Sequence, residues 1–106
     1  MALDEPAFLV DLDVRGRSCL VVGRGFSANR RAAALQACGA EVTVVSSHGY
    51  TTGMASRFAV VVTCDRRVDD QVAHDARAGG ALLHVVGDPE HSTVLLPTFH
   101  LRQLAS

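Results

Sequence analysis

The stretch Ser18-Cys-Leu-Val-Val-Gly-Arg-Gly-Phe-Ser-Ala-Asn-Arg-Arg31 decides the fold of this chain of 106 residues. A short apolar β-type run ends in Gly23-x-Gly25-x-x-Ala28, and an alanine-rich helical pattern follows it. This order predicts a strand, a tight glycine turn and a helix N-terminus, which together suit the pyrophosphate of a dinucleotide. Gly23 would allow the tight turn, Gly25 would let the backbone approach phosphate, and Ala28 would let the helix pack near the strand. The second interpretation is a glycine turn with a structural role only.

Apolar runs alternate with helical patterns along the chain. The expected elements are strands at 18–22, 41–45, 58–63, 81–86 and 93–96, and helices at 26–38 and 66–78. Near-continuous valine and leucine runs between helices are typical of a parallel sheet that is covered on both faces. We therefore predict an α/β fold, a minimal Rossmann-like parallel sheet of about five strands with helices on both faces. Asp70, His74 and Asp75 are expected on the polar outer face of the second helix.

Composition limits the class of protein. The chain is 48% hydrophobic with a net charge of −1, which predicts one domain over residues 1–106 and argues against nucleic-acid binding. The N-terminus has no signal-peptide pattern, and the sequence has no apolar run long enough to span a membrane, so we expect a cytoplasmic protein. Cys19, Cys38 and Cys64 lie far apart and are interpreted as buried thiols in a reducing compartment.

Ligands of parallel sheets bind at the carboxyl ends of the strands, and the candidate cofactor-binding residues come from there. They are Gly23, Arg24, Gly25, Phe26, Ser27, Ala28, Ser46, Ser47, Thr63 and Cys64. Ser46, Ser47 and His48 stand where an NAD site often has an acidic residue for the ribose. NAD is the expected cofactor, and NADP is not excluded because Arg24 would tolerate a 2′-phosphate. A solvated loop is an equally good interpretation of residues 46–48.

The candidate catalytic residues lie near the end of the last strong strand. His84 is late in that strand, where it is either a satisfied core residue or a catalyst. Asp88 and His91 flank Pro89 in the loop beside it, and either is able to act as an acid or a base. The five histidines show no metal-ligand spacing, so no metal site is expected.

Three further expectations concern the end of the third strand, at residues 63–65, and the arginines around the glycine turn. Asp65 is expected to cap the second helix, while Thr63 is equally able to contact the cofactor. Cys64 has no evident activating partner, which argues against a nucleophile there. Three arginines, at positions 24, 30 and 31, either hold substrate carboxylates or form the solvated start of the first helix.

An ordered set of segments resembles the N-terminal domain of siroheme synthase, the precorrin-2 dehydrogenase and sirohydrochlorin ferrochelatase family. The segments are Phe8-Leu-Val-Asp-Leu12, the glycine turn at 21–31, Cys38-Gly-Ala-Glu-Val-Thr-Val-Val45, residues 72–90, which end in His-Val-Val-Gly-Asp-Pro-Glu90, and Leu95-Leu-Pro97. The resemblance implies NAD-dependent oxidation of precorrin-2 to sirohydrochlorin, with a tetrapyrrole substrate. Some family members also insert iron.

The chain departs from that family at the position of its key aspartate. Gly87 stands there, and Asp88 follows one place later as a substitute. The family's dimerisation region and helical domain are also missing from this sequence. The resemblance therefore implies a weakened dehydrogenase module with poor iron insertion. The alternatives are a non-catalytic module that binds a dinucleotide or a partner protein, and one piece of a split enzyme.

The apolar side chains of the C-terminal tail at 97–106 predict self-association. Phe99, Leu101 and Leu104 have little following chain to cover them, and small domains bury limited apolar surface. We expect a homodimer, or docking on a protein partner, through this segment.

Overall fold

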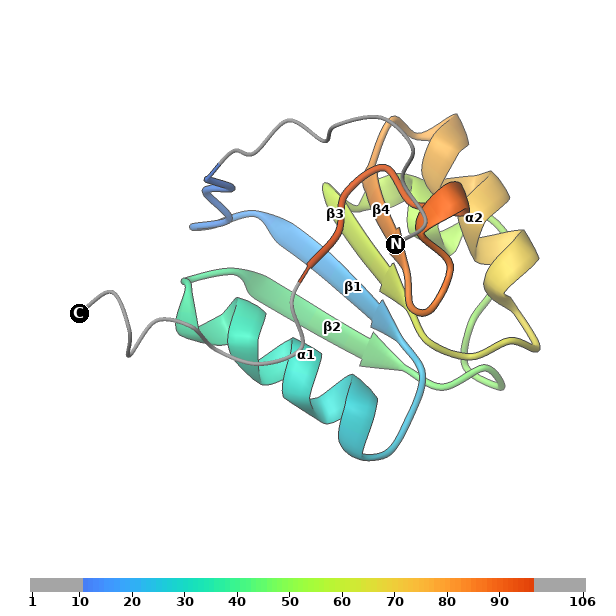
Figure 1. The fold of residues 1–106 in the computed structure, drawn as a ribbon, viewed down its shortest axis with the longest axis horizontal. Coiled ribbons are helices and arrows are strands. Elements are labelled where there is room, and N and C mark those ends of the chain that lie inside the picture. Colours follow the sequence, from blue (N-terminus) through green and yellow to red (C-terminus); the bar gives the residue numbers. More distant parts are fainter. Residues whose placement is uncertain (1–10, 97–106) are drawn as a thin grey trace.

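The computed structural model describes residues 11–96 of the chain. Its elements are β1 (Ser18–Val22), α1 (Phe26–Ala37), β2 (Glu41–Val45), the 3-10 turn η1 (Met54–Arg57), β3 (Val60–Thr63), α2 (Asp69–Ala78), β4 (Leu82–Val85) and the 3-10 turn η2 (Pro89–His91). The strands form one parallel sheet in the order β2-β1-β3-β4, with α1 and α2 on opposite faces (Figure 1). The predicted α/β Rossmann-like class, with helices on both faces, is confirmed.

The alternation of side chains along β1 explains why both faces are apolar. Leu20 and Val22 pack with α2 in one buried cluster, whereas Cys19 and Val21 pack with α1 in a second cluster. A strand with both faces covered needs apolar residues at every position, which is what the run at 18–22 supplies. β1 and β3 are the two inner strands, and the edge strand β2 is more exposed.

The predicted fifth strand at 93–96 is wrong, because the described sheet has four strands. Residues 92–94 run beside β4 but use side-chain hydroxyls where a strand would use carbonyls. Ser92 Oγ accepts from the Val85 N–H at 2.8 Å, and Thr93 Oγ1 accepts from the Leu83 N–H at 2.7 Å. The N–H groups of Thr93 and Val94 both donate to the one carbonyl of Leu83. The edge of β4 is therefore satisfied without a ladder.

The start of the second helix also differs from the prediction. α2 begins at Asp69 and not at residue 66, and no side chain caps it among the described residues. Asp65 does not cap the helix as expected, since its carboxylate accepts from the backbone and guanidinium N–H groups of Arg67. An Asx turn thus precedes the helix. Cys38 is a further correction, because it is exposed while Cys19 is buried and Cys64 is half-buried.

Asp75 was expected on the outer face of α2, and the structure places it in the interior, 5% exposed. Its carboxylate accepts from the Tyr50 hydroxyl at 2.5 Å, the Gly53 N–H at 2.7 Å and the Gln71 amide at 3.0 Å. Burial alone would raise the pKa of Asp75, but these hydrogen bonds outweigh it and the pKa is lowered. Burial and the bond to Asp75 raise the pKa of Tyr50 to about 12. Asp75 therefore fixes the long loop after β2 onto α2.

Two remaining expectations concern membrane-spanning segments and the C-terminal tail. Within residues 11–96, no helix has the length and apolar character needed to cross a membrane. The tail predicted to mediate self-association, residues 97–106, lies outside the described residues.

Replacing Asp75 by asparagine should lower the free energy of unfolding at pH 7 by about 2 kcal/mol, because charge-assisted hydrogen bonds are lost and an amide N–H₂ faces donors. The folded pKa of Asp75 is depressed below its ordinary value of 3.8, so its stabilisation is complete above that value. This stabilisation disappears as the pH falls through the folded pKa. Urea unfolding between pH 7 and pH 2 measures both effects, and Asp70→Asn on the exposed face is the control. Equal losses in the two variants would contradict the role of Asp75.

Candidate functional site

The parallel register brings the ends of all four strands to one edge of the sheet. Beyond the last paired residues, the Gly23 N–H donates to the Val45 carbonyl at 2.8 Å and the Cys64 N–H donates to the Val22 carbonyl at 2.9 Å. On the other side, the Val86 N–H donates to the Thr63 carbonyl at 2.9 Å. The glycine turn, the tip of β2, the end of β3 and the loop after β4 are therefore neighbours, as the sequence predicts.

Two glycines shape the turn after β1, each for a different reason. A Cβ at Gly23 would lie 2.5 Å from Cys64 Sγ, and the φ of Gly23 is +147°. Gly23 is thus required by the close packing of β1 against the end of β3. Gly25 has a φ of +85°, and a Cβ there would meet no atom within 4 Å. The space where a Cβ of Gly25 would lie is therefore open.

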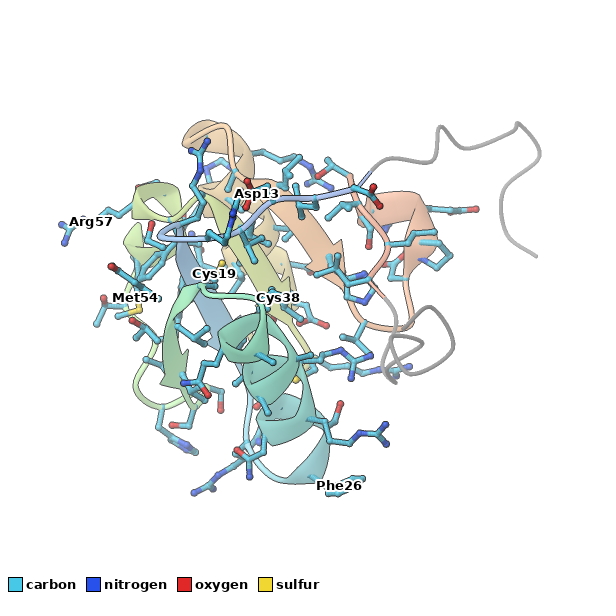
Figure 2. The ribbon with its side chains drawn as sticks, turned by 90° about the vertical axis from the view of Figure 1, so that its left-hand side faces the viewer. Asp13, Cys19, Phe26, Cys38, Met54 and Arg57 are labelled. Atoms are coloured by element: carbon cyan, nitrogen blue, oxygen red, sulfur yellow. The ribbon has the colours of Figure 1, made fainter. Side chains whose placement is uncertain are left out.

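The N-terminus of α1 has the features of an anion site. No side chain caps this end among the described residues, and its first turn carries no acidic residue. The N–H groups of the first helical turn and the positive end of the helix dipole favour a negative group there. Phe26 projects from the tip of the helix, 76% exposed, with the Arg30 guanidinium 5.2 Å from its ring (Figure 2). Ser27 and Ala28 follow in the same turn of α1.

The tip of β2 forms a turn and not a free loop. Ser46 Oγ accepts from the Gly49 N–H at 3.2 Å, and the Ser46 carbonyl accepts from the Gly49 and Tyr50 N–H groups. The hydrogen bonds from Arg67 lower the pKa of Asp65, and a hydrogen bond from Ser47 acts in the same direction. Ser47 therefore meets a carboxylate from the end of β3. No acidic residue of β2 itself is at this edge, since Glu41 starts the strand.

The polar side chains at the end of β3, Thr63 and Cys64, are engaged in hydrogen bonds within the protein. The Thr63 hydroxyl is fully buried and donates to Asp69 at 2.6 Å, which ties β3 to the start of α2. Burial raises the pKa of Cys64, and its thiol donates to the Val22 carbonyl at 3.3 Å. The thiolate that a nucleophile needs is thus disfavoured, and the cofactor contact predicted for Cys64 stays a prediction.

The three arginines of the glycine turn and α1 have different surroundings. Arg24 and Arg30 are exposed, whereas Arg31 is 7% exposed and corrects the interpretation of a solvated helix start. Arg31 Nη1 donates to Ser27 Oγ at 2.9 Å, and its buried Nε has no partner among the described residues. The sequence contains a signal for this burial, because residues 28, 31, 32 and 35 form one helical stripe.

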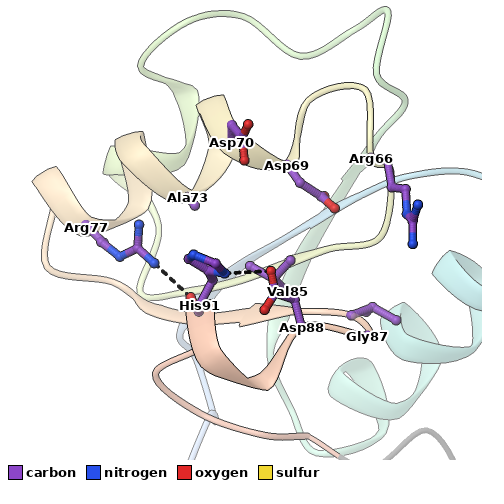
Figure 3. A pocket seen from close by; sticks show the side chains of 10 residues that line it. Arg66, Asp69, Asp70, Ala73, Arg77, Val85, Gly87, Asp88 and His91 are labelled. Atoms are coloured by element: carbon purple, nitrogen blue, oxygen red, sulfur yellow. Dashed lines mark hydrogen bonds and ion pairs between the residues drawn. The ribbon is translucent and has the colours of Figure 1, made fainter. Parts of the chain in front are cut away.

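A cavity of about 400 Å³ lies between α2 and the loop after β4 (Figure 3). It is lined by Arg66, Asp69, Asp70, Ala73, Arg77, Val85, Val86, Gly87, Asp88 and His91. Asp88 was expected beside the site, whereas the contribution of α2 to the lining was not expected. The signal for it is the spacing of Asp69, Ala73 and Arg77, which are four residues apart and share one helix face.

The two catalytic candidates lie apart. Asp88 lines the cavity, and His91 Nδ1 is 2.7 Å from Asp88 Oδ2. His84 is absent from the lining and lies beside Val62, which belongs to the α1-side cluster. Burial lowers the pKa of His84, while the Val94 carbonyl, 3.2 Å from its Nδ1, opposes this shift. His84 thus has the surroundings of a satisfied core histidine. Residues 11–96 contain no group of three metal-ligating side chains.

Comparison with known proteins agrees with this geometry. Residues 10–98 match the family described as "Putative NAD(P)-binding". The chain belongs to this NAD(P)-binding family. It is also similar to the N-terminal part of proteins named siroheme synthase, which confirms the resemblance seen in the sequence. The family membership indicates a nicotinamide dinucleotide as the class of cofactor.

The relatives come from several bacteria. The siroheme synthase of Nitrosococcus oceani is 32% identical over 108 residues, which cover 82% of this chain and 23% of the relative. That of Chromobacterium violaceum is 33% identical over 111 residues, covering 85% of this chain and 24% of the relative. The chain thus spans about a quarter of the length of the curated relatives it matches.

Introducing a side chain at Gly23 should disrupt the contact between β1 and β3. Gly23→Ala is expected to lower the free energy of unfolding by about 2–4 kcal/mol, because the new Cβ overlaps Cys64 Sγ and the positive φ adds strain. A double-mutant cycle with Cys64→Ala, measured by urea unfolding, should return about 1–3 kcal/mol as coupling. Additive losses in the cycle would show that the two residues are not in contact.

Proposed function

We propose that this chain is the dinucleotide-binding module of a siroheme-synthase-type dehydrogenase, with NAD as cofactor and precorrin-2 as the tetrapyrrole substrate. The open glycine turn at Gly25, beside the uncapped N-terminus of α1, is the observation that carries the cofactor assignment. The similarity to proteins named siroheme synthase supports the substrate assignment. When bound, the cofactor accepts a hydride from the substrate.

The residues at the edge of the sheet fit such a cofactor. The first turn of α1 would hold the pyrophosphate, and Gly25 leaves room for its close approach. Ser46 and Ser47 would face the adenosine ribose from the tip of β2. Arg24 is exposed on the turn itself, so NADP remains the second cofactor of this proposal. The proposed location is the cytoplasm, and the proposed assembly is a homodimer or a complex with a protein partner.

The proposed dehydrogenase is a weakened one. Gly87 stands at the family's aspartate position, at the wall of the cavity, with a φ of +81°. Asp88 is the proposed substitute, although successive residues of an extended segment point to opposite sides. General acid or base help is worth roughly 10²- to 10⁴-fold in rate, so turnover should be lower by about that factor.

A binding module without catalysis is the second candidate function. Gly87 favours it, because the loop keeps its place beside the cavity while the acidic side chain of the family is missing. In this alternative the chain binds a dinucleotide or a protein partner. A split enzyme is a further form of the proposal, in which turnover appears only when a second chain is added.

Calorimetric titration of the chain with NAD, NADH, NADP and NADPH should show binding of at least one dinucleotide. Gly25→Ala should weaken that binding at least about 10-fold, because a methyl group would occupy the open space that pyrophosphate approaches. Gly53→Ala is the control, since Gly53 has a similar φ of +86° and equally open surroundings but precedes η1. Absence of heat for every dinucleotide at millimolar concentration would overturn the cofactor assignment.

Restoring the family's acidic residue tests the weakened site. Gly87→Asp should raise turnover of precorrin-2 with NAD by about 10²-fold, because an acid or base returns to the cavity wall. A Cβ at this position meets no atom within 4 Å, and aspartate tolerates a positive φ better than most residues. Turnover is measured by NADH absorbance, with Gly80→Asp as a control that has a φ of +75° and open surroundings. Unchanged turnover in Gly87→Asp would favour the binding module.

A further inference from the structure

The cavity beside α2 contains a histidine, His91, that is paired with Asp88 and has no role in the proposed function so far. His91 Nδ1 lies 2.7 Å from Asp88 Oδ2, and both residues line the cavity (Figure 3). An ionised carboxylate only accepts hydrogen bonds, so it selects the tautomer of the neutral ring in which Nδ1 carries the proton. The other ring nitrogen, Nε2, then has a lone pair that is able to take a proton.

Several contacts hold this pair in place relative to β4. The Asp88 N–H donates to the Val85 carbonyl at 3.0 Å, and the Ser92 hydroxyl lies 2.9 Å from the Asp88 carbonyl. From α2, Arg77 Nη2 donates to the His91 carbonyl at 2.9 Å. The loop that carries the pair is therefore attached both to the end of the sheet and to the helix across the cavity. These contacts fix the backbone of the loop, while the side chains of His91 and Asp88 are 62% and 41% exposed and open to a ligand.

We propose that His91 is the proton-transfer residue of this module and that Asp88 is its positioning residue. The inference rests on the proposed dehydrogenase function. A substrate that is oxidised by a nicotinamide dinucleotide loses two electrons and two protons in total, as one hydride and one proton. One hydrogen leaves as hydride to the oxidised cofactor. The other leaves as a proton to His91 Nε2, which releases it to solvent after the product dissociates.

The assignment also accounts for Gly87. A carboxylate one place later than the family's aspartate points in another direction, and here Asp88 bonds to an imidazole. Histidine titrates near neutral pH, which suits a base at that pH better than a carboxylate does. The charged groups that face the pair are Asp69, Asp70 and Arg77 on α2, with Arg66 in the loop before it. The two arginines offer partners for acidic side chains of a substrate.

The tautomer of His91 is the first test, because it needs neither cofactor nor turnover. In the full chain, side-chain ¹⁵N spectra of the neutral His91 ring should show the proton on Nδ1. Asp88→Asn should shift the proton toward Nε2, since the bond to a negatively charged acceptor is lost. Glu90→Gln removes a charge from the same turn without touching that bond, and it should leave the tautomer unchanged. A parent ring protonated on Nε2 would overturn the proposal.

Turnover is the second test, with calorimetric NAD affinity as an independent readout. His91→Gln should lower the residual kcat with precorrin-2 and NAD by about 10²-fold, with NAD affinity unchanged. Asp88→Asn should lower kcat less than His91→Gln does, because it changes the tautomer of the base and does not remove the base. Retained turnover in His91→Gln, or no turnover in a parent that binds NAD, overturns the role of His91. If the parent chain does not bind NAD, the proposed function is overturned instead.

Discussion

The close approach of Gly23 to Cys64 is the constraint on which the candidate site depends. With no side chain at Gly23, the end of β1 lies against the end of β3, and the chain turns at once into α1. The same turn keeps β1 hydrogen-bonded to both neighbours, through Gly23 to Val45 and through Val22 to Cys64. The strand ends therefore meet at one edge. A larger residue at position 23 would separate β1 from β3 and with them the two halves of that edge.

Local pattern was sufficient to predict the inner sheet and both helices, because each is dictated by short-range chemistry. β1 and β3 need apolar residues on both faces, and such runs are visible in a sequence. The prediction of a fifth strand was wrong because the hydroxyl groups of Ser92 and Thr93 accept hydrogen bonds from the N–H groups of β4. The pattern of residue types does not show that side chains will take this role. The prediction that Asp75 is exposed was wrong because its partners Tyr50 and Gly53 lie more than 20 residues away in the sequence.

The candidate site divides in the same way. Strand ends predict which residues share an edge, so the glycine turn and the tip of β2 were placed correctly beside each other. The pairing of Asp88 with His91 depends on the 3-10 turn η2. A segment of three residues has too little sequence pattern to predict such a turn. The residues of α2 that line the cavity could be predicted only with knowledge of where that helix lies relative to β4. The burial of Arg31 was the exception, since its helical spacing with Ala28 and Leu35 was readable in advance.

The two halves of the proposed site lie on opposite faces of the sheet. The glycine turn leads into α1 on one face, while the cavity with Asp88 and His91 lies against α2 on the other. A dinucleotide that serves both must cross the carboxyl ends of β1 and β3. β1 and β4 are two strand spacings apart, about 10 Å, which is within reach of an extended dinucleotide. Under the proposed function, the pyrophosphate would stay on the α1 side and the reacting ring would lie near the cavity. Cys64 lies half-buried between these two parts, and burial raises the pKa of its thiol, so this side chain adds no charge where the dinucleotide would pass.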